Sequence, residues 1–143
     1  MIKKIIAILF MIGASSSACH SAEIVGIGGK CLDVKGGSSA NSTEIILYRC
    51  HGGKNQRWEV IDGAIKGLGG KCLDVKGGSS ANSTEIILYR CHGGENQQWE
   101  VVNGAIKGIG GKCLDVKGGG SADSTQIILY SCHGGDNQRW IIR

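Results

Sequence analysis

Apolar and polar positions alternate along this chain in short stretches, which are separated by loops rich in glycine and serine. In Cys31–Val34 the side chains alternate with a period of two, the period of a strand. Thr43–Cys50 is the strongest strand candidate because it is rich in isoleucine, leucine and tyrosine. Ile24–Val25 and Trp58–Ile61 are shorter candidates. No window keeps a helical period, since glycine and serine clusters interrupt each one. The pattern therefore predicts an all-β protein.

The same order of segments occurs three times. Lys30–Trp58 returns as Lys71–Trp99 and as Lys112–Trp140, at a constant spacing of 41 residues. The first two copies of the full unit differ at only five positions, whereas the third differs more and ends at Arg143. A fixed period of this length indicates a repeat architecture. We expect repeats at residues 24–64, 65–105 and 106–143, with four strands each.

The connections between units favour a closed arrangement. Asp62-Gly63 and Asn103-Gly104 match the type I′ hairpin turn, and each would join strands of neighbouring units. One unit has too few apolar residues for a core of its own; its candidates are Leu32, Val34, Ile45, Leu47, Trp58 and Val60. Three near-identical units without distinct caps favour closure around a pseudo-threefold axis over an open solenoid. We therefore predict a β-trefoil over residues 23–143.

Six of the seven cysteines occupy two positions of the repeat. Because each unit should pair its cysteines in the same way, we predict one disulfide per repeat: Cys31–Cys50, Cys72–Cys91 and Cys113–Cys132. Each would close a loop of about 20 residues and contribute on the order of 3 kcal/mol in the chain-entropy model. No Cys-x-x-Cys pair occurs. We therefore predict no metal site and no cofactor.

Residues 1–22 resemble a signal peptide. Two lysines precede the apolar run Ile5–Ile12, which is too short to span a bilayer, and Ser16-Ser17-Ala18 suits a signal peptidase. We expect this segment to be cleaved and the protein to be secreted or periplasmic. The alternative is a lipid anchor on Cys19 at a bacterial envelope, although Ser16 stands where lipoprotein signals usually carry leucine.

The charge of the chain is mild. The formal net charge of +4 falls to about +2 without the two leader lysines, and basic residues are interleaved with acidic ones. A nucleic-acid partner is excluded, because it would require clustered lysine and arginine.

Three short motifs recur in register in every unit. They are Cys-Leu-Asp-Val, Leu-Tyr-x-Cys-His and Asn-Gln-x-Trp, and together they resemble the ricin-type lectin repeat, most closely the bacterial carbohydrate-binding modules of family 13. The resemblance covers Ile24–Arg143. It implies that the aspartate anchors sugar hydroxyls, the tyrosine stacks, histidine and asparagine complete the rim, and glutamine mainly supports the site. It places Trp58 in the core.

Each unit holds the groups that a sugar site needs. Aromatic rings cover the apolar face of a pyranose, a carboxylate accepts from adjacent hydroxyls, and amides complete the rim. The candidates are Asp33, Tyr48, His51, Asn55 and Gln56; Asp74, Tyr89, His92, Asn96 and Gln97; and Asp115, Tyr130, His133, Asn137 and Gln138. Simpler alternatives are that Asp33 caps a turn, that Tyr48 is a core residue, that His51 is an ordinary loop residue and that Asn55 is a turn residue. Ile46, Ile87 and Ile128 share a strand face with the tyrosines where relatives often carry a polar residue, which predicts a more apolar rim.

These features favour binding over catalysis. No nucleophile elbow is present, and each motif holds one acid rather than the pair used in glycoside hydrolysis. We predict a secreted lectin, not an enzyme, with three equivalent shallow sites that bind polymeric or clustered galactose-, xylan- or mannose-type glycans by avidity. One alternative is a protein-interaction β-trefoil, such as a protease inhibitor or a toxin or adhesin subunit, that uses the copy-specific Lys54, Glu95 or Asp136. Another is a glycan-targeting subunit of a separately encoded glycoside hydrolase.

Overall fold

The computed structural model describes residues 21–143, so most of the predicted leader, including Cys19, lies outside the described residues. The described chain forms twelve short strands, which confirms the all-β prediction. They are β1 (Ile24–Val25), β2 (Cys31–Val34), β3 (Thr43–Tyr48), β4 (Glu59–Ile61), β5 (Ala64–Lys66), β6 (Cys72–Val75), β7 (Thr84–Tyr89), β8 (Glu100–Val102), β9 (Ala105–Lys107), β10 (Cys113–Val116), β11 (Thr125–Tyr130) and β12 (Ile141–Ile142).

Single turns of 3₁₀ geometry, three residues each, connect many of the strands. They are η1 (Ile27–Gly29), η2 (Lys35–Gly37), η3 (Lys54–Gln56), η4 (Leu68–Gly70), η5 (Lys76–Gly78), η6 (Glu95–Gln97), η7 (Ile109–Gly111), η8 (Lys117–Gly119) and η9 (Asp136–Gln138). Within residues 21–143, no helix has the length and apolar character that a membrane crossing requires.

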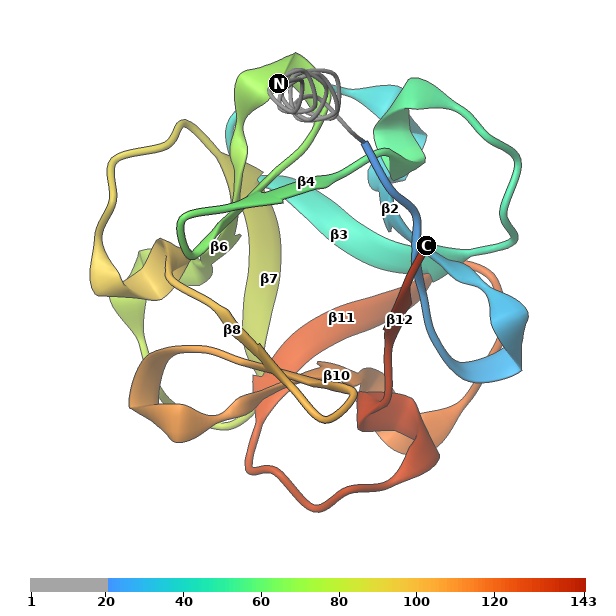
Figure 1. The fold of residues 1–143 in the computed structure, drawn as a ribbon, viewed down its shortest axis with the longest axis vertical. Coiled ribbons are helices and arrows are strands. Elements are labelled where there is room, and N and C mark those ends of the chain that lie inside the picture. The colour runs from blue at the N-terminus through green and yellow to red at the C-terminus, as the bar shows by residue number, and fades with distance from the viewer. Residues whose placement is uncertain (1–20) are drawn as a thin grey trace, which may run out of the picture.

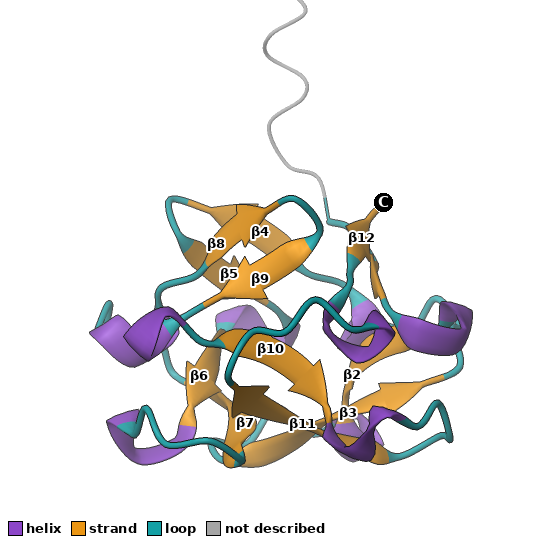
Figure 2. Cartoon of the chain, turned by 90° about the horizontal axis from the view of Figure 1, so that it is seen from below, coloured by secondary structure: helices purple, strands orange, loops and turns teal. Residues whose placement is uncertain are grey.

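The three long strands surround the pseudo-threefold axis (Figure 1). β3, β7 and β11 each pair with the other two, and each also pairs with the strand before it, β2, β6 or β10. These six strands form a barrel. The remaining strands form the pairs β4–β5, β8–β9 and β1–β12, and Figure 2 shows β4, β5, β8 and β9 at one end of the molecule. The fold is the predicted β-trefoil.

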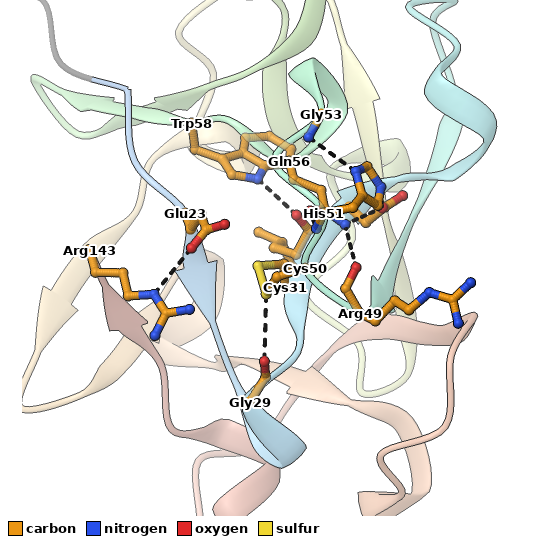
Figure 3. The surroundings of a disulfide bond; sticks show 12 residues. Glu23, Gly29, Cys31, Arg49, Cys50, His51, Gly53, Gln56, Trp58 and Arg143 are labelled. Atoms are coloured by element: carbon orange, nitrogen blue, oxygen red, sulfur yellow. Dashed lines mark hydrogen bonds and ion pairs between the residues drawn. A yellow bond between two sulfur atoms is a disulfide. The ribbon is translucent and has the colours of Figure 1, made fainter.

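Two of these three strand pairs are hairpins, and the chain ends make the third. The type I′ turns are confirmed, since φ is 50° at Asp62, 49° at Asn103 and 84° at the glycine that follows each. In the third pair, Glu23 and Arg143 exchange two backbone hydrogen bonds of 2.9 and 3.0 Å, and the Arg143 guanidinium lies 3.1 Å from the Glu23 carboxylate (Figure 3). The ring of repeats therefore closes through the two ends of the folded region.

The fold begins one residue before the predicted boundary. Ala22 and Trp58 exchange backbone hydrogen bonds of 2.7 and 2.8 Å. Gly63 and Gly104 hold the equivalent place in the next units, where they accept from Trp99 and Trp140. Ala22 thus belongs to the repeat pattern, and cleavage after Ala18 would keep it. The cleavage itself stays a prediction.

A single apolar core fills the barrel, and the three repeats contribute the same positions to it. Leu32, Val34, Ile45, Leu47 and Trp58 are buried, as predicted, with their counterparts in the other two repeats. Val60 was wrongly predicted as core, since 44% of it is exposed in the β4–β5 hairpin. Its partner in that hairpin, Ile65, is buried instead.

Each tryptophan joins its own repeat to the next one. The indole Nε1 of Trp58 donates to the Leu32 carbonyl at 3.0 Å, and its ring lies against Gly67 of the second repeat. A Cβ on Gly67 would lie 2.6 Å from the ring, so only glycine fits there. The same packing recurs at Trp99–Gly108 and Trp140–Gly26, and the last of these pairs closes the ring.

We expect Gly67→Ala to lower the free energy of unfolding by about 1–3 kcal/mol, because the new methyl group overpacks the Trp58 ring. Denaturant unfolding of the oxidised protein measures this. Gly120→Ala is the control, since Gly120 has a φ of −84° and no atom lies where its Cβ would make contact. Equal stability of the two variants would contradict the packing role.

Candidate functional site

In each repeat, polar side chains meet where a short strand, the end of a long strand and the following turn come together. Asp33 lies on β2, paired with Ile46 of β3, and Tyr48 ends β3. The Cys31–Cys50 disulfide joins these segments with Cα atoms 5.1 Å apart. All three predicted disulfides are confirmed. They bring the acid and the aromatic ring of each repeat to one place.

The aspartate carboxylate is buried and is held by two amides. The Nδ2 of Asn55 donates to one oxygen of Asp33 at 3.2 Å, and the Nε2 of Gln56 donates to the other at 2.8 Å. Asp33 is only 3% exposed. The alternative that Asp33 caps a turn is therefore wrong, because its partners are side chains of η3. Each oxygen still has acceptor capacity for a further hydrogen bond.

The glutamine side chain fixes the position of the carboxylate through hydrogen bonds to the surrounding backbone. The Nε2 of Gln56 also donates to the Arg49 carbonyl at 2.9 Å, and its Oε1 accepts from the His51 backbone N–H at 2.8 Å. Gln56 is fully buried and does not line the hollow beside Asp33. Gln97 and Gln138 make the same bonds. The arrangement agrees with the supporting role that the family resemblance implies for Gln56, Gln97 and Gln138.

The histidine is oriented by the backbone of the loop that contains it. The Gly53 N–H donates to Nδ1 of His51 at 3.0 Å (Figure 3). In the neutral ring the proton is therefore assigned to Nε2, which lies 3.6 Å from Asp33. The Tyr48 ring meets His51 edge to face, with centroids 6.1 Å apart. His51 is thus part of the cluster rather than an ordinary loop residue.

Burial raises the pKa of the Asp33 carboxyl above its ordinary value of 3.8. The hydrogen bond from Gln56, the nearby His51 and the bond from Asn55 act in the opposite direction but do not cancel it. Asp74 and Asp115 are raised for the same reasons. The three carboxyl groups therefore hold their protons more tightly in the folded protein than in the unfolded chain.

Each cluster opens into a shallow hollow. The volumes are about 280, 380 and 390 Å³ in the first, second and third repeats. Each is lined by the aspartate, tyrosine, histidine and asparagine predicted for it, and by Ile46, Ile87 or Ile128, as the apolar-rim prediction requires. A separate hollow of about 430 Å³ beside the Cys72–Cys91 disulfide contains none of these acids or tyrosines.

Besides the glycines of η2, η5 and η8, two kinds of lining residue were missed in the sequence. One is the lysine that follows the Cys-Leu-Asp-Val motif, and its position directly after the strand could have indicated it. The other is a serine from the preceding repeat, which no motif within one unit could have indicated. They are Lys35 and Ser124 in the first hollow, Lys76 and Ser42 in the second, and Lys117 and Ser83 in the third.

The third site shares the cluster but differs in its surroundings. Arg49 and Arg90 lie over the tyrosine rings of the first two sites at 5.5 Å from the centroid, and Ser131 takes this position in the third. Lys35 and Lys76 each pair with a glutamate at 3.1 Å. In the third repeat the glutamate is replaced by Gln126, and Lys117 has no carboxylate within 4.0 Å in the described chain. The three clusters therefore contain the same side chains but differ in their surroundings, and the equivalence of three glycan sites stays a prediction.

One group of potential metal ligands occurs in residues 21–143. Glu23, Cys31 and Cys50 have ligand atoms within 4.8 Å of one another. Both sulfurs belong to the first disulfide, so neither is a thiolate that could ligate a metal. The contact of 3.5 Å between the Cys50 sulfur and the Gly29 carbonyl (Figure 3) likewise involves no S–H donor.

The sequence matches the family described as "Ricin-type beta-trefoil lectin domain" over residues 20–140. Because the match covers most of the chain and the fold and the clusters agree with it, the protein belongs to this family of carbohydrate-binding lectins. The resemblance inferred from the three motifs is confirmed. A specific closeness to family 13 modules stays a prediction.

Solved structures with the same fold include a designed protein, a natural lectin and part of a galactanase. The designed threefold-symmetric protein ThreeFoil is 35% identical, with a TM-score of 0.77 over 85% of this chain and 96% of its own. The C-terminal half of an earthworm R-type lectin, in complex with GalNAc, is 23% identical, with a TM-score of 0.74 over 87% and 98%. The exo-β-1,3-galactanase 1,3Gal43A of Clostridium thermocellum is 32% identical, with a TM-score of 0.78 over 85% of this chain but 29% of the enzyme.

A curated relative shares a short segment with this chain. The "Probable lipoprotein EnvE" of Salmonella typhimurium is 51% identical over 39 residues. The match covers 27% of this chain and 22% of that protein.

We expect Asp33, Asp74 and Asp115 to titrate above 3.8 in a carbon-13 NMR titration, and Asp123, whose pKa the hydrogen bond from Lys30 lowers, to titrate below it. Because the folded state holds these three protons more tightly, their contribution to stability falls as pH rises from the unfolded pKa through the folded one. Acidification through that window therefore increases their contribution. Midpoints at or below 3.8 for these three groups would contradict the burial argument.

Proposed function

We propose that this protein is a secreted lectin that binds glycans without altering them, through one site in each of its three repeats. The observation that carries the proposal is the recurrence of the same cluster, an aspartate, a tyrosine, a histidine and an asparagine around a hollow, in every repeat.

The groups in each hollow suit a pyranose. The free acceptor capacity of the Asp33 carboxylate receives ligand hydroxyls in charge-assisted hydrogen bonds. The Tyr48 ring and Ile46 cover the apolar C–H face of the sugar. The Nε2 of His51, at 3.6 Å from the carboxylate, is close enough to be oriented by it and far enough to donate to a ligand oxygen. The amides of Asn55 and Gln56 hold the acid in place.

Three sites on one rigid body would compensate for weak binding at each. A millimolar site supplies only about −4 kcal/mol. The three repeats lie around one axis (Figure 1), and each contains one hollow, so a polymeric or clustered glycan can engage more than one of them. Linking such sites raises the overall affinity by a factor of roughly 10² or more.

Galactose-type sugars are the ligands that the comparisons favour. The earthworm lectin half is in complex with GalNAc, and the Clostridium relative is an exo-β-1,3-galactanase. Xylan- and mannose-type glycans are the predicted alternatives, and a glycan array separates the three classes. The galactanase match also supports a second role, the targeting of a separately encoded glycoside hydrolase to its substrate.

Three disulfides support export to an oxidising compartment. The lipoprotein name of the Salmonella relative supports the envelope alternative, in which Cys19 carries a lipid. Mass spectrometry of the mature N-terminus separates secretion from anchoring.

We expect the substitutions Asp33→Asn, Asp74→Asn and Asp115→Asn to remove one site each. Loss of a charge-assisted hydrogen-bond acceptor costs about 1.5–3 kcal/mol, or roughly 10- to 150-fold in affinity at that site. Isothermal titration of the oxidised protein with β-1,3-galactobiose would count three sites in the parent and none in the triple variant, and retention on galactan would be lost.

The control is Asp62→Asn, which makes the same charge change in an exposed turn where the second repeat already has Asn103. Near-ultraviolet circular dichroism confirms that each variant is folded. A folded triple variant that still binds glycan would refute the site. Binding that depends on Lys54, Glu95 or Asp136 instead would favour the protein-interaction alternative.

A further inference from the structure

Three serines adopt a backbone conformation that favours glycine. φ is +71° at Ser42 and +72° at Ser83 and Ser124. In residues 21–143 the other non-glycine residues with positive φ are Asp62 and Asn103, which lie in type I′ turns that suit aspartate and asparagine. Serine lacks that preference, so the conformation costs free energy in every repeat.

Hydrogen bonds to the next repeat hold each serine in this conformation. The Ser42 N–H donates to the Leu88 carbonyl at 2.8 Å, and the preceding Asn41 side chain accepts from the Arg90 N–H at 2.9 Å. These two bonds lie on either side of Tyr89, the predicted stacking residue. The same pair of bonds recurs at Ser83–Leu129 with Asn82–Ser131 and at Ser124–Leu47 with Asp123–Arg49.

The serines line the hollows of the repeats to which they are bonded. Ser42 of the first repeat lines the hollow that contains Asp74 and Tyr89 of the second. Ser83 and Ser124 occupy the same place in the third and first hollows. The three side chains are exposed, and their hydroxyls have no hydrogen-bond partner in the part of the chain that the structure describes.

We propose that Ser42, Ser83 and Ser124 are ligand-contacting residues, so that each sugar site is assembled from two repeats. The inference rests on the proposed function. A hydroxyl both donates and accepts, and it would therefore bond a hydroxyl or ring oxygen of a saccharide held by the aspartate of the next repeat.

The strain is what points to a role in binding. Glycine would adopt this conformation without steric cost, and strained residues that persist tend to cluster at functional sites. The hydroxyl is not needed to hold the loop, because the hydrogen bond from each serine to the next repeat is donated by its backbone N–H. The third repeat differs from the others at Asp123 and Gln126, on either side of Ser124, yet it keeps the serine.

The test uses a background with one working site. Asp33→Asn with Asp115→Asn leaves the second site, which contains Asp74 from its own repeat and Ser42 from the preceding one. In that background we expect Ser42→Gly to weaken binding of β-1,3-galactobiose by roughly 3- to 10-fold, the loss of one neutral hydrogen bond. The melting temperature should be unchanged or higher, because glycine relieves the strain. NMR titration measures the affinity.

Ser83→Gly in the same background is the matched control. It makes the same change within the second repeat, but its hydroxyl lines the third hollow, so the affinity should not change. Ser42→Ala should weaken binding to a similar extent without any gain in stability, which separates the loss of the hydroxyl from the flexibility of glycine.

Unchanged affinity in Ser42→Gly, or equal losses in Ser42→Gly and Ser83→Gly, would overturn the two-repeat site. The proposed function would still stand in that case if Asp74→Asn abolished the remaining binding. Galactobiose binding that survived Asp74→Asn in this background would overturn both the proposed site and the role of the serines.

Discussion

The packing of one tryptophan per repeat on a glycine of the next is the contact on which the closed fold depends. Trp58 donates a hydrogen bond to the Leu32 carbonyl of its own repeat, and its ring packs on Gly67 of the second repeat. In the same way, Trp140 of the third repeat packs on Gly26 of the first. A unit of this length cannot bury its apolar face alone. Three of these contacts close a ring, so every repeat packs its tryptophan on the next repeat and contributes a glycine to the one before it. Pairing of the two chain ends completes the connection between the third repeat and the first.

The same dependence between neighbours extends to the sites. Within a repeat, the disulfide and the buried glutamine fix the aspartate against the histidine and tyrosine. Between repeats, an asparagine or aspartate and the strained serine beside it bond the strand of the next unit around its tyrosine. In the proposed sites the aspartate, the histidine and the asparagine are held by protein groups rather than by the ligand, which lowers the ordering cost of binding a weak ligand such as a sugar.

Near-identity of the repeats does not make the surroundings of the three sites identical. Gln126 donates from one Nε2 to both Glu44 and Glu85, so it satisfies two carboxylates that would otherwise face a third. The same replacement leaves Lys117 in the third hollow without the partner that Lys35 and Lys76 have. With Ser131 in place of an arginine, Tyr130 is also more open to solvent. The single replacement of a glutamate by Gln126 thus alters both the contacts between the long strands of the barrel and the surroundings of the third hollow.

The sequence alone determined the strands, the threefold closure, the disulfide pairing and the identity of the clustered side chains. The period-two alternation and the type I′ turn residues are local signals that a single segment carries. The fixed repeat presents each signal three times in the same order. Tertiary structure decided what depends on contacts between units: the exposure of Val60, the place of Ala22 in the fold and the serine that reaches the next hollow. Those features follow from which backbone groups of one repeat face the next, and no motif within a single repeat encodes that relation.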